Sequence, residues 1–382
     1  MNETQRALQA MAREFALNVM RPKSLELDRN PDPAKCFSWE VIEEGSRLGL
    51  RTLVVSEKGG GGGADLPTMC LVAEELGYGD LGMASALNQC WCFSRILERL
   101  ANQGQRERFL KPFMADPRFL LAQAMTEPNA GTDNIFPYDA PDGGYTMSAV
   151  PDGDHFVLNG TKMFITNGGA ASLYFVNTRT DRSVGISTGT TIFLVPAGSP
   201  GLRVASYIDK PGRRCVLTAE LHFQDVRVPR ENILGALNQP PSPWAALAGM
   251  HFFGVMAVGT ARAAFEMALE HARGRVQGGK PIREHQAVKL MLGEMWMLLE
   301  TARAVAHQGA RWVEQAYDPK VSAWVKDVCV EYAYRVCQIA MDLFGGYAYV
   351  RGQPVEKFYR DTMSYRHPFP GHIIRMRIAD LL

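Results

Sequence analysis

The sequence contains little that binds metals, forms disulfides or attracts polyanions. Its seven cysteines are scattered and odd in number, and the closest pair, Cys90 and Cys92, has no second pair to complete a motif. Such spacing is a poor metal or redox motif, so we expect no metal site and idle thiols in a reducing compartment. The formal net charge of +1 gives no reason to expect nucleic acid or an anionic membrane surface as a partner.

The sequence also lacks a segment typical of a leader peptide or a membrane anchor. Residues 1–20 include four charged side chains, Glu3, Arg6, Arg13 and Glu14, a pattern that a signal peptide does not have. The most apolar run, residues 244–259, is interrupted by His251 and is too short to span a bilayer. We therefore predict a cytoplasmic protein that does not bind membranes.

What the sequence does contain is enough chain for two or three domains, with 382 residues of which 46% are hydrophobic and 21% charged. Residues 1–118 show helical periodicity, beginning with apolar residues three and four apart from Leu8 to Val19. Residues 119–230 hold short segments rich in Val, Phe, Thr and Tyr between turn dipeptides, and Asn159-Gly160 is a strong hairpin signal. This pattern predicts an N-terminal helical domain followed by an antiparallel β domain.

Residues 231–382 return to long helical patterns. We expect these helices to cover residues 244–277, 284–317, 320–344 and 355–363. Long helices with brief connections predict an antiparallel four-helix bundle. The predicted fold class is therefore α+β, in the order helical domain, β domain and helical bundle.

Two polar turns, each following a predicted strand, stand out in the β domain. Residues 124–133 read Ala-Met-Thr-Glu-Pro-Asn-Ala-Gly-Thr-Asp, and residues 159–169 read Asn-Gly-Thr-Lys-Met-Phe-Ile-Thr-Asn-Gly-Gly. Gly131 permits close approach of a ligand to the backbone, and Thr126 and Thr132 add hydroxyls beside a turn that we expect to expose free N–H groups. Two such turns with Phe164 between them could hold a flat aromatic cofactor, although the same composition also suits ordinary surface loops.

The length, order and spacing of these two motifs resemble the FAD-binding signature of the acyl-CoA dehydrogenase family. The helical–β–helical order is also the architecture of that family, and the resemblance covers nearly the whole chain. It implies that FAD is bound without a covalent link by Met125, Thr126, Gly131, Thr132, Phe164 and Thr166. Phe164 and Thr166 would cover one flavin face and bond near N5.

Two segments of the bundle resemble the motifs with which the family reaches a neighbouring subunit's FAD. Residues 273–281 resemble Arg-x-x-Phe-Gly-Lys-Pro, and we assign Arg275 to the partner's pyrophosphate because a guanidinium matches phosphate oxygens in pairs. Gly346 lies in a matching Gly-Gly-Tyr. Gly278 and Asp342 depart from the family's Phe and Gln. The resemblance implies a homotetramer built as a pair of dimers, with a heteromer as the alternative.

The carboxylate base that the family's chemistry requires is missing. Its usual glutamate position falls at Pro368 or Phe369, and residues 362–372 contain no carboxylate. The other position known in the family corresponds to Gly249. His367 is the candidate base, because imidazole can accept a proton near neutral pH, but it is equally interpretable as an ordinary loop histidine. For His251 we favour a packed, hydrogen-bonded side chain.

The resemblance implies an FAD-dependent oxidoreductase of fatty acid metabolism. It would oxidise the α,β bond of a CoA thioester or related acyl substrate, pass hydride to flavin N5, and hand electrons to a transfer partner. The missing base leaves two alternatives open. One is a flavin-dependent monooxygenase of the same superfold, and the other is a partner subunit that lends its half-site to a base-bearing chain.

Overall fold

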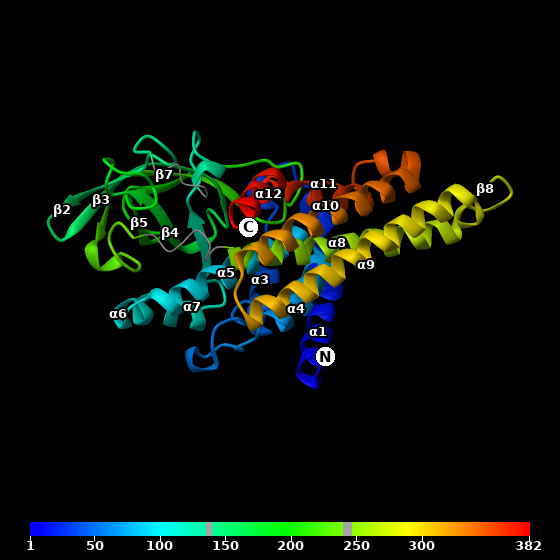
Figure 1. Cartoon of the computed structure of the whole chain (residues 1–382), viewed down its shortest axis with the longest axis horizontal. Coiled ribbons are helices and arrows are strands. Elements are labelled where there is room, and N and C mark those ends of the chain that lie inside the picture. The colour runs from blue at the N-terminus through cyan, green and yellow to red at the C-terminus, as the bar shows by residue number, and fades with distance from the viewer. Residues whose placement is uncertain (135–139, 240–246) are drawn as a thin grey trace.

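The computed structural model describes residues 1–134, 140–239 and 247–382 and has three parts along the chain (Figure 1). The first part is helical: α1 Glu3–Phe15, α2 Arg21–Asp28, α3 Trp39–Arg47, α4 Leu66–Gly79, α5 Leu81–Leu100, α6 Gln103–Gln105 and α7 Lys111–Ala115. Side chains define its helix starts, because Asp65 caps α4 and Asp80 caps α5 by accepting from backbone N–H groups. The predicted boundary at residue 118 lies in the connection between α7 and the first strand.

The middle part is one seven-stranded sheet. Its strands are β1 Leu120–Ala124, β2 Ser148–Asp152, β3 His155–Thr166, β4 Ala171–Arg179, β5 Thr190–Pro196, β6 Leu202–Tyr207 and β7 Thr218–Pro229. The order is β1-β4-β2-β3-β7-β6, with β5 on β4. Most pairs are antiparallel, as predicted, but β1 runs parallel to β4. The chain reaches β4 only after the β2–β3 hairpin, so the β1–β4 pair is not set by a local turn.

The third part contains the long helices of the bundle and a small hairpin at one end (Figure 1). Its elements are α8 Leu247–Gly274, β8 Val276–Gln277, β9 Lys280–Pro281, α9 Gln286–Gln315, α10 Pro319–Phe344, α11 Pro354–Ser364 and α12 Gly371–Asp380. The expected helices correspond to α8 to α11, and the first three residues expected for α8, 244–246, lie outside the described residues. The sequence analysis did not predict α12, which begins directly after Pro370.

Glycines allow α4 and α8 to cross with their backbones in contact. A Cβ on Gly77 would lie 2.0 Å from the carbonyl oxygen of Met256, and one on Gly259 would lie 1.9 Å from that of Glu74. The Thr260 hydroxyl donates to the Gly77 carbonyl at 2.7 Å. Because α5 follows α4 after one residue, this crossing also fixes α5 against the bundle.

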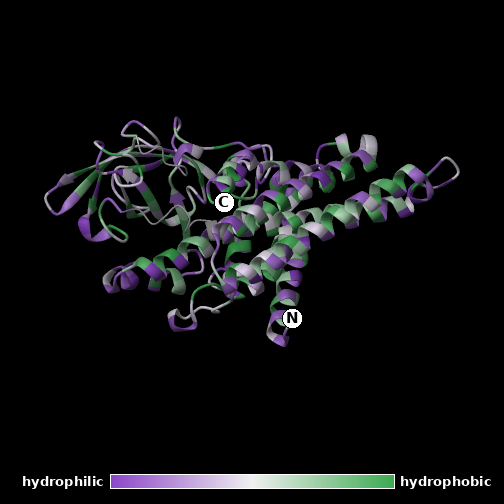
Figure 2. Cartoon of the chain, in the orientation of Figure 1, coloured by the Kyte–Doolittle hydropathy of each residue, from purple (hydrophilic) through white to green (hydrophobic). Residues whose placement is uncertain are grey.

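The α8 helix is apolar and mostly internal. By length and composition alone, residues Met250–Gly274 could cross a membrane, but 67% of the tested window is buried inside the structure, as in a core helix. Figure 2 shows apolar residues along the bundle helices and mostly polar residues at the outer end of the β2–β3 hairpin. The seven cysteines are free thiols, six of them buried, consistent with the expectation that they are idle.

Candidate functional site

A cavity of about 550 Å³ lies where the β domain, α5 and the bundle meet. All six residues that the sequence assigned to the two polar turns line it, and so does His367: Met125, Thr126, Gly131, Thr132, Phe164, Thr166 and His367. The structure thus brings together residues separated by more than two hundred positions. Arg275 and Gly346 line a different hollow.

The first turn presents unpaired hydroxyls to the cavity. The Gly131 N–H donates to Asp133 Oδ1 at 2.7 Å, so this one N–H of the turn is not free. The Asp133 carboxylate folds back onto its own turn and takes that donor. The hydroxyls of Thr126 and Thr132 have no partner among the described residues, and a Cβ on Gly131 would meet no protein atom within 4 Å. The turn therefore opens onto space that suits a polar ligand.

The second turn presents an aromatic ring and a further hydroxyl. Phe164 has φ 59° and is 56% exposed, which is an unusual backbone conformation for a bulky residue. The pairing of β3 with β7 shifts between Lys162 and Ile165 and resumes at Ile165, so that Thr166 lies opposite Thr218. The Thr166 hydroxyl has no partner within the part of the chain that the structure describes. Backbone strain of this kind persists where the surroundings enforce it, often at ligand sites.

A buried ion pair joins the two turns. Lys162 Nζ donates to Glu127 Oε1 and to the Met125 carbonyl, both at 2.9 Å. The Glu127 carboxylate also accepts from the backbone N–H groups of Thr146 and Met147 at 2.7 and 2.8 Å. Both side chains lie inside the two motifs, but the sequence analysis gave neither a role. The sequence signal that could have identified the pair is that two residues of opposite charge occupy the same position, the fourth, in the two motifs.

The charge state of this pair follows from its surroundings. Burial lowers the pKa of the Lys162 ammonium to about 8, and the Glu127 carboxylate opposes that shift. Burial raises the pKa of the Glu127 carboxyl, but Lys162 and the backbone donors outweigh burial, so its pKa lies below its usual value. Both groups are therefore charged at pH 7, and the pair stays ionic.

The helical wall of the cavity comes from residues that the sequence analysis did not single out. Ser85, Gln89, Cys92, Phe93 and Ile96 line it from α5, at the three- and four-residue spacing of one helix face. Phe253 adds a ring from α8, and residues 210–213 add a loop between β6 and β7. The spacing on α5 is visible in the sequence, but nothing there distinguishes a cavity wall from a core face.

The segment after α11 contributes His367, Pro368 and Phe369 to the cavity. Phe369 has φ 53°, and its carbonyl accepts from Lys326 Nζ at 2.6 Å. The His367 ring is exposed and has no hydrogen-bond partner in residues 1–134, 140–239 and 247–382. Among the described residues that line the cavity, none is Asp or Glu. No positioned carboxylate is thus available there as a base.

His251 does not belong to this cavity. Its side chain is fully buried, and its ring Nε2 lies 3.0 Å from the Ala306 carbonyl oxygen. Burial lowers the pKa of His251 to about 4, so the ring is neutral at pH 7. The interpretation of His251 as a packed histidine agrees with this geometry.

A second hollow of about 460 Å³ lies at the hairpin end of the bundle and holds Arg275 and Gly346. Arg275 lies over the Tyr347 ring, with 5.8 Å from its Cζ to the centroid. A Cβ on Gly346 would meet no protein atom within 4 Å. Asp342 lines the same hollow but makes no ion pair with Arg275. Within one chain, the residues assigned to its own FAD and those assigned to a partner's FAD therefore lie in two different hollows.

Comparison with known proteins gives consistent matches over the chain. Residues 2–116, 122–226 and 252–372 match the profiles described as the N-terminal, middle and C-terminal domains of acyl-CoA dehydrogenase. The short-chain specific acyl-CoA dehydrogenase of Megasphaera elsdenii is 34% identical over 360 residues, which are 92% of this chain and 90% of that protein.

Solved structures match as well. The butyryl-CoA dehydrogenase structure from Megasphaera elsdenii superposes with a TM-score of 0.92 and 31% identity, covering 100% of this chain and 98% of that one. A glutaryl-coenzyme A dehydrogenase in complex with glutaryl-CoA gives a TM-score of 0.91 with 26% identity, covering 99% and 95%.

Proposed function

The chain belongs to the acyl-CoA dehydrogenase family, and from this we propose that it is an FAD-dependent oxidoreductase that oxidises an acyl thioester between its α and β carbons. Bound FAD would supply the hydride acceptor. The observation that carries the proposal is the cavity itself, in which the unpaired hydroxyls of Thr126, Thr132 and Thr166 and the exposed ring of Phe164 face one space.

These residues fit a flavin dinucleotide. The threonine hydroxyls are donors and acceptors for the polar edges of a flavin ring. The Phe164 ring offers an apolar face against which a flat aromatic group packs. The open space at Gly131 leaves room for close approach to the backbone.

We predict that the purified protein is yellow and that heat or acid releases its FAD, because every proposed contact is non-covalent. An absorbance spectrum before and after denaturation and filtration measures this. A colourless protein that takes up no FAD on titration would contradict the proposal. The variant Thr166→Val, which removes one unpaired hydroxyl, should weaken FAD binding about tenfold, the value of roughly one hydrogen bond.

The handling of the α-proton distinguishes this chain from a typical acyl-CoA dehydrogenase. Two groups that line the cavity can serve as proton acceptor: the exposed His367 imidazole and the Lys210 amine, whose pKa burial lowers to about 7. The absence of a lining carboxylate keeps two alternatives in view: a flavin-dependent monooxygenase and a partner subunit of a heteromer. Product analysis for a hydroxylated compound, and mass spectrometry for a copurified related chain, distinguish them.

We also propose a homotetramer built as a pair of dimers. Supporting it, Arg275 and Gly346 lie in a hollow separate from the main cavity, which suits residues that serve a partner's FAD. The α9 helix also exposes large apolar side chains, Leu290, Trp296, Met297 and Trp312, at 70%, 55%, 65% and 46%. A cytoplasmic location, a role in fatty acid metabolism and an electron-transfer partner complete the proposal.

We predict that light scattering gives the mass of four chains and that Arg275→Gln lowers FAD occupancy without unfolding the subunit. Arg273→Gln is the matched control, because Arg273 is an exposed neighbour whose ion-pair partner is Glu270 at 3.8 Å. A monomer that retains full FAD would contradict the shared site.

A further inference from the structure

The conformation and hydrogen bonding of the backbone at Arg213 fix the starting point of its side chain. It lies in the loop between β6 and β7 with φ 49°, in the left-handed region that an arginine rarely adopts. Its backbone N–H donates to Asp361 Oδ1 at 2.6 Å. Asp361 is itself fixed by Lys357, whose Nζ lies 2.5 Å from Asp361 Oδ2 and 2.6 Å from Asp80 Oδ2. In this buried cluster one ammonium lies between two carboxylates, and the bond from the Arg213 N–H to Asp361 fixes where the Arg213 side chain begins.

The Arg213 guanidinium forms part of the cavity wall, and the two side chains that it contacts, Ser85 and Tyr365, are neutral. Its Nη1 lies 3.4 Å from Ser85 Oγ, and its Cζ lies 4.6 Å from the centroid of the Tyr365 ring. Its Nε is buried without a hydrogen-bond partner. No carboxylate pairs with this side chain anywhere in the described part of the chain. A partly buried cation without a counter-ion is unusual in a folded protein.

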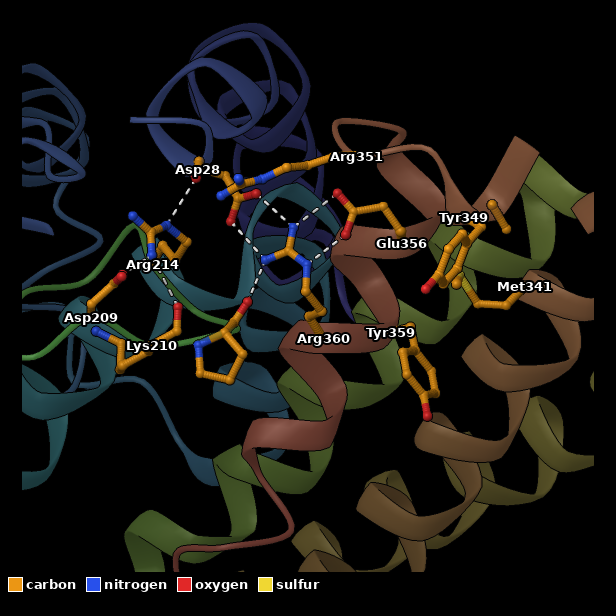
Figure 3. Close-up of a pocket in the computed structure, with 12 residues that line it drawn as sticks. Asp28, Asp209, Lys210, Arg214, Met341, Tyr349, Arg351, Glu356, Tyr359 and Arg360 are labelled. Carbon is orange, nitrogen blue, oxygen red and sulfur yellow. Dashed lines mark hydrogen bonds and ion pairs between the residues drawn. The ribbon is translucent and has the colours of Figure 1, made fainter. Parts of the chain in front are cut away.

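Neighbouring arginines show the usual arrangement. Figure 3 shows Arg360 pointing between the carboxylates of Asp28 and Glu356, with Arg360 Nη2 2.6 Å from Asp28 Oδ2. Arg214, adjacent to Arg213 in sequence, pairs with Asp209. Arg360 and Arg214 in the hollow of Figure 3 are therefore each paired with a carboxylate, whereas Arg213 is not.

The other charged groups of the main cavity do not compensate Arg213. Lys210 is also cationic when protonated, and its Nζ is already committed to the Val216 carbonyl and Thr218 Oγ1 at 2.8 and 2.9 Å. His367 carries no negative charge in either state. The cavity wall thus offers one unpaired guanidinium beside the Ser85 hydroxyl, and no acid among its described residues.

We propose that Arg213, assisted by Ser85, binds a carboxylate at the far end of the acyl group, so that the substrate is the thioester of a dicarboxylic acid. This rests on the proposed dehydrogenase function. A guanidinium presents paired donors that match a carboxylate. The Ser85 hydroxyl donates to the Leu81 carbonyl at 2.5 Å and accepts from Arg213 Nη1, so it helps to position the guanidinium. Ser85 and Ile96 bound the α5 wall roughly 16 Å apart at 1.5 Å per residue, with Gln89 and then the apolar Cys92 and Phe93 between them. A short apolar chain ending in an anion suits that wall.

The experiment compares matched thioesters on the FAD-loaded protein. Isothermal titration in the absence of oxygen measures the affinities for glutaryl-CoA and for pentanoyl-CoA, which has the same chain length and no terminal charge. We expect glutaryl-CoA to bind about 10- to 100-fold more tightly, the contribution of a charge-assisted hydrogen-bonded pair. Equal affinities in the wild type would overturn the proposal.

Variants test the assignment to Arg213. In Arg213→Gln the preference for glutaryl-CoA should disappear, Arg213→Lys should retain part of it, and Ser85→Ala should reduce it. The control is Arg203→Gln, which removes an exposed arginine on β6 that interacts with His222. If Arg213→Gln weakens both thioesters equally while its thermal unfolding matches the control, Arg213 does not read the carboxylate. If Arg213→Gln does not fold, Arg213→Lys and Ser85→Ala decide in the same way.

Flavin absorbance separates this inference from the proposed function. A preference for glutaryl-CoA without any bleaching of the flavin supports the carboxylate site and contradicts the dehydrogenase function. Bleaching of the flavin by pentanoyl-CoA, with no preference for glutaryl-CoA, supports the dehydrogenase function and contradicts the carboxylate site. Free glutarate is the third arm: if it binds as tightly as glutaryl-CoA, the site recognises a free acid rather than the end of an acyl thioester.

Discussion

Replacing Phe369 by glutamate should increase the rate of flavin reduction by a saturated acyl-CoA by about 10² to 10⁴, the usual effect of one positioned general base. Phe369 lines the cavity in the segment between α11 and α12, at one of the two positions to which the family's glutamate corresponds. In the wild type no described lining residue supplies a carboxylate, so proton removal from the α carbon lacks its usual acceptor. Anaerobic stopped-flow absorbance of the flavin measures the rate.

Two controls identify the base. Phe369→Gln has a side chain of similar shape that cannot accept a proton, so it should not reproduce the gain. His367→Ala tests the imidazole: a further loss of several orders of magnitude from a slow wild-type rate would make His367 the base. Fast wild-type reduction that survives His367→Ala would show that our interpretation of this segment is wrong. No reduction in any of these proteins favours a monooxygenase or a partner subunit.

The slow flavin reduction expected of the wild type has a second physical cause if Pro368 occupies the glutamate position. In this family the base residue's own backbone N–H helps to polarise the thioester carbonyl, and proline has no N–H. His367 can replace a proton acceptor but not that hydrogen bond. Under this alignment Pro368→Glu should raise the rate, because it supplies both the carboxylate and the backbone N–H. Pro368→Ala supplies the N–H alone and should not, and the same absorbance measurement tests both variants.

The order of domains and most helices could be predicted because their signals are local. Apolar residues three and four apart mark a helix wherever it packs, and the expected helix at 320–344 differs from α10, Pro319–Phe344, by one residue. Two features of the fold were not predicted, because local sequence patterns do not determine them. The parallel pairing of β1 with β4 joins strands separated by a hairpin, and α12 follows two prolines in a segment with no strong periodicity.

The residues of the site also fall into those that local motifs predict and those that depend on distant contacts. Thr126, Thr132, Phe164 and Thr166 were predictable because two contiguous motifs contain them. The Arg213 contact with Ser85 joins residues 128 positions apart, and no local pattern brings them together. The hydrogen bond of the Gly131 N–H was not predicted, because its acceptor is the Asp133 side chain two residues later. Side-chain bonds inside a turn are decided by geometry that composition does not contain.

Lys162→Met should reduce the free energy of unfolding by about 3 to 5 kcal/mol, because it leaves the Glu127 carboxylate buried without its counter-ion. The Lys162 side chain is 0% exposed and that of Glu127 is 6% exposed. The matched control is Lys111→Met, which breaks a surface pair with Glu107 at 3.1 Å and should cost about 0.5 kcal/mol or less. Chemical denaturation followed by circular dichroism measures both.

The double variant Lys162→Met, Glu127→Gln separates the buried charge from the geometry of the turns. Removing both charges should recover much of the lost stability, since the main cost of the single change is an uncompensated carboxylate. FAD affinity should not recover to the same extent, because Lys162 Nζ also holds the Met125 carbonyl at 2.9 Å and so fixes the first turn against the second. If stability and FAD affinity recover together, the ion pair stabilises the domain without positioning the two turns for the cofactor.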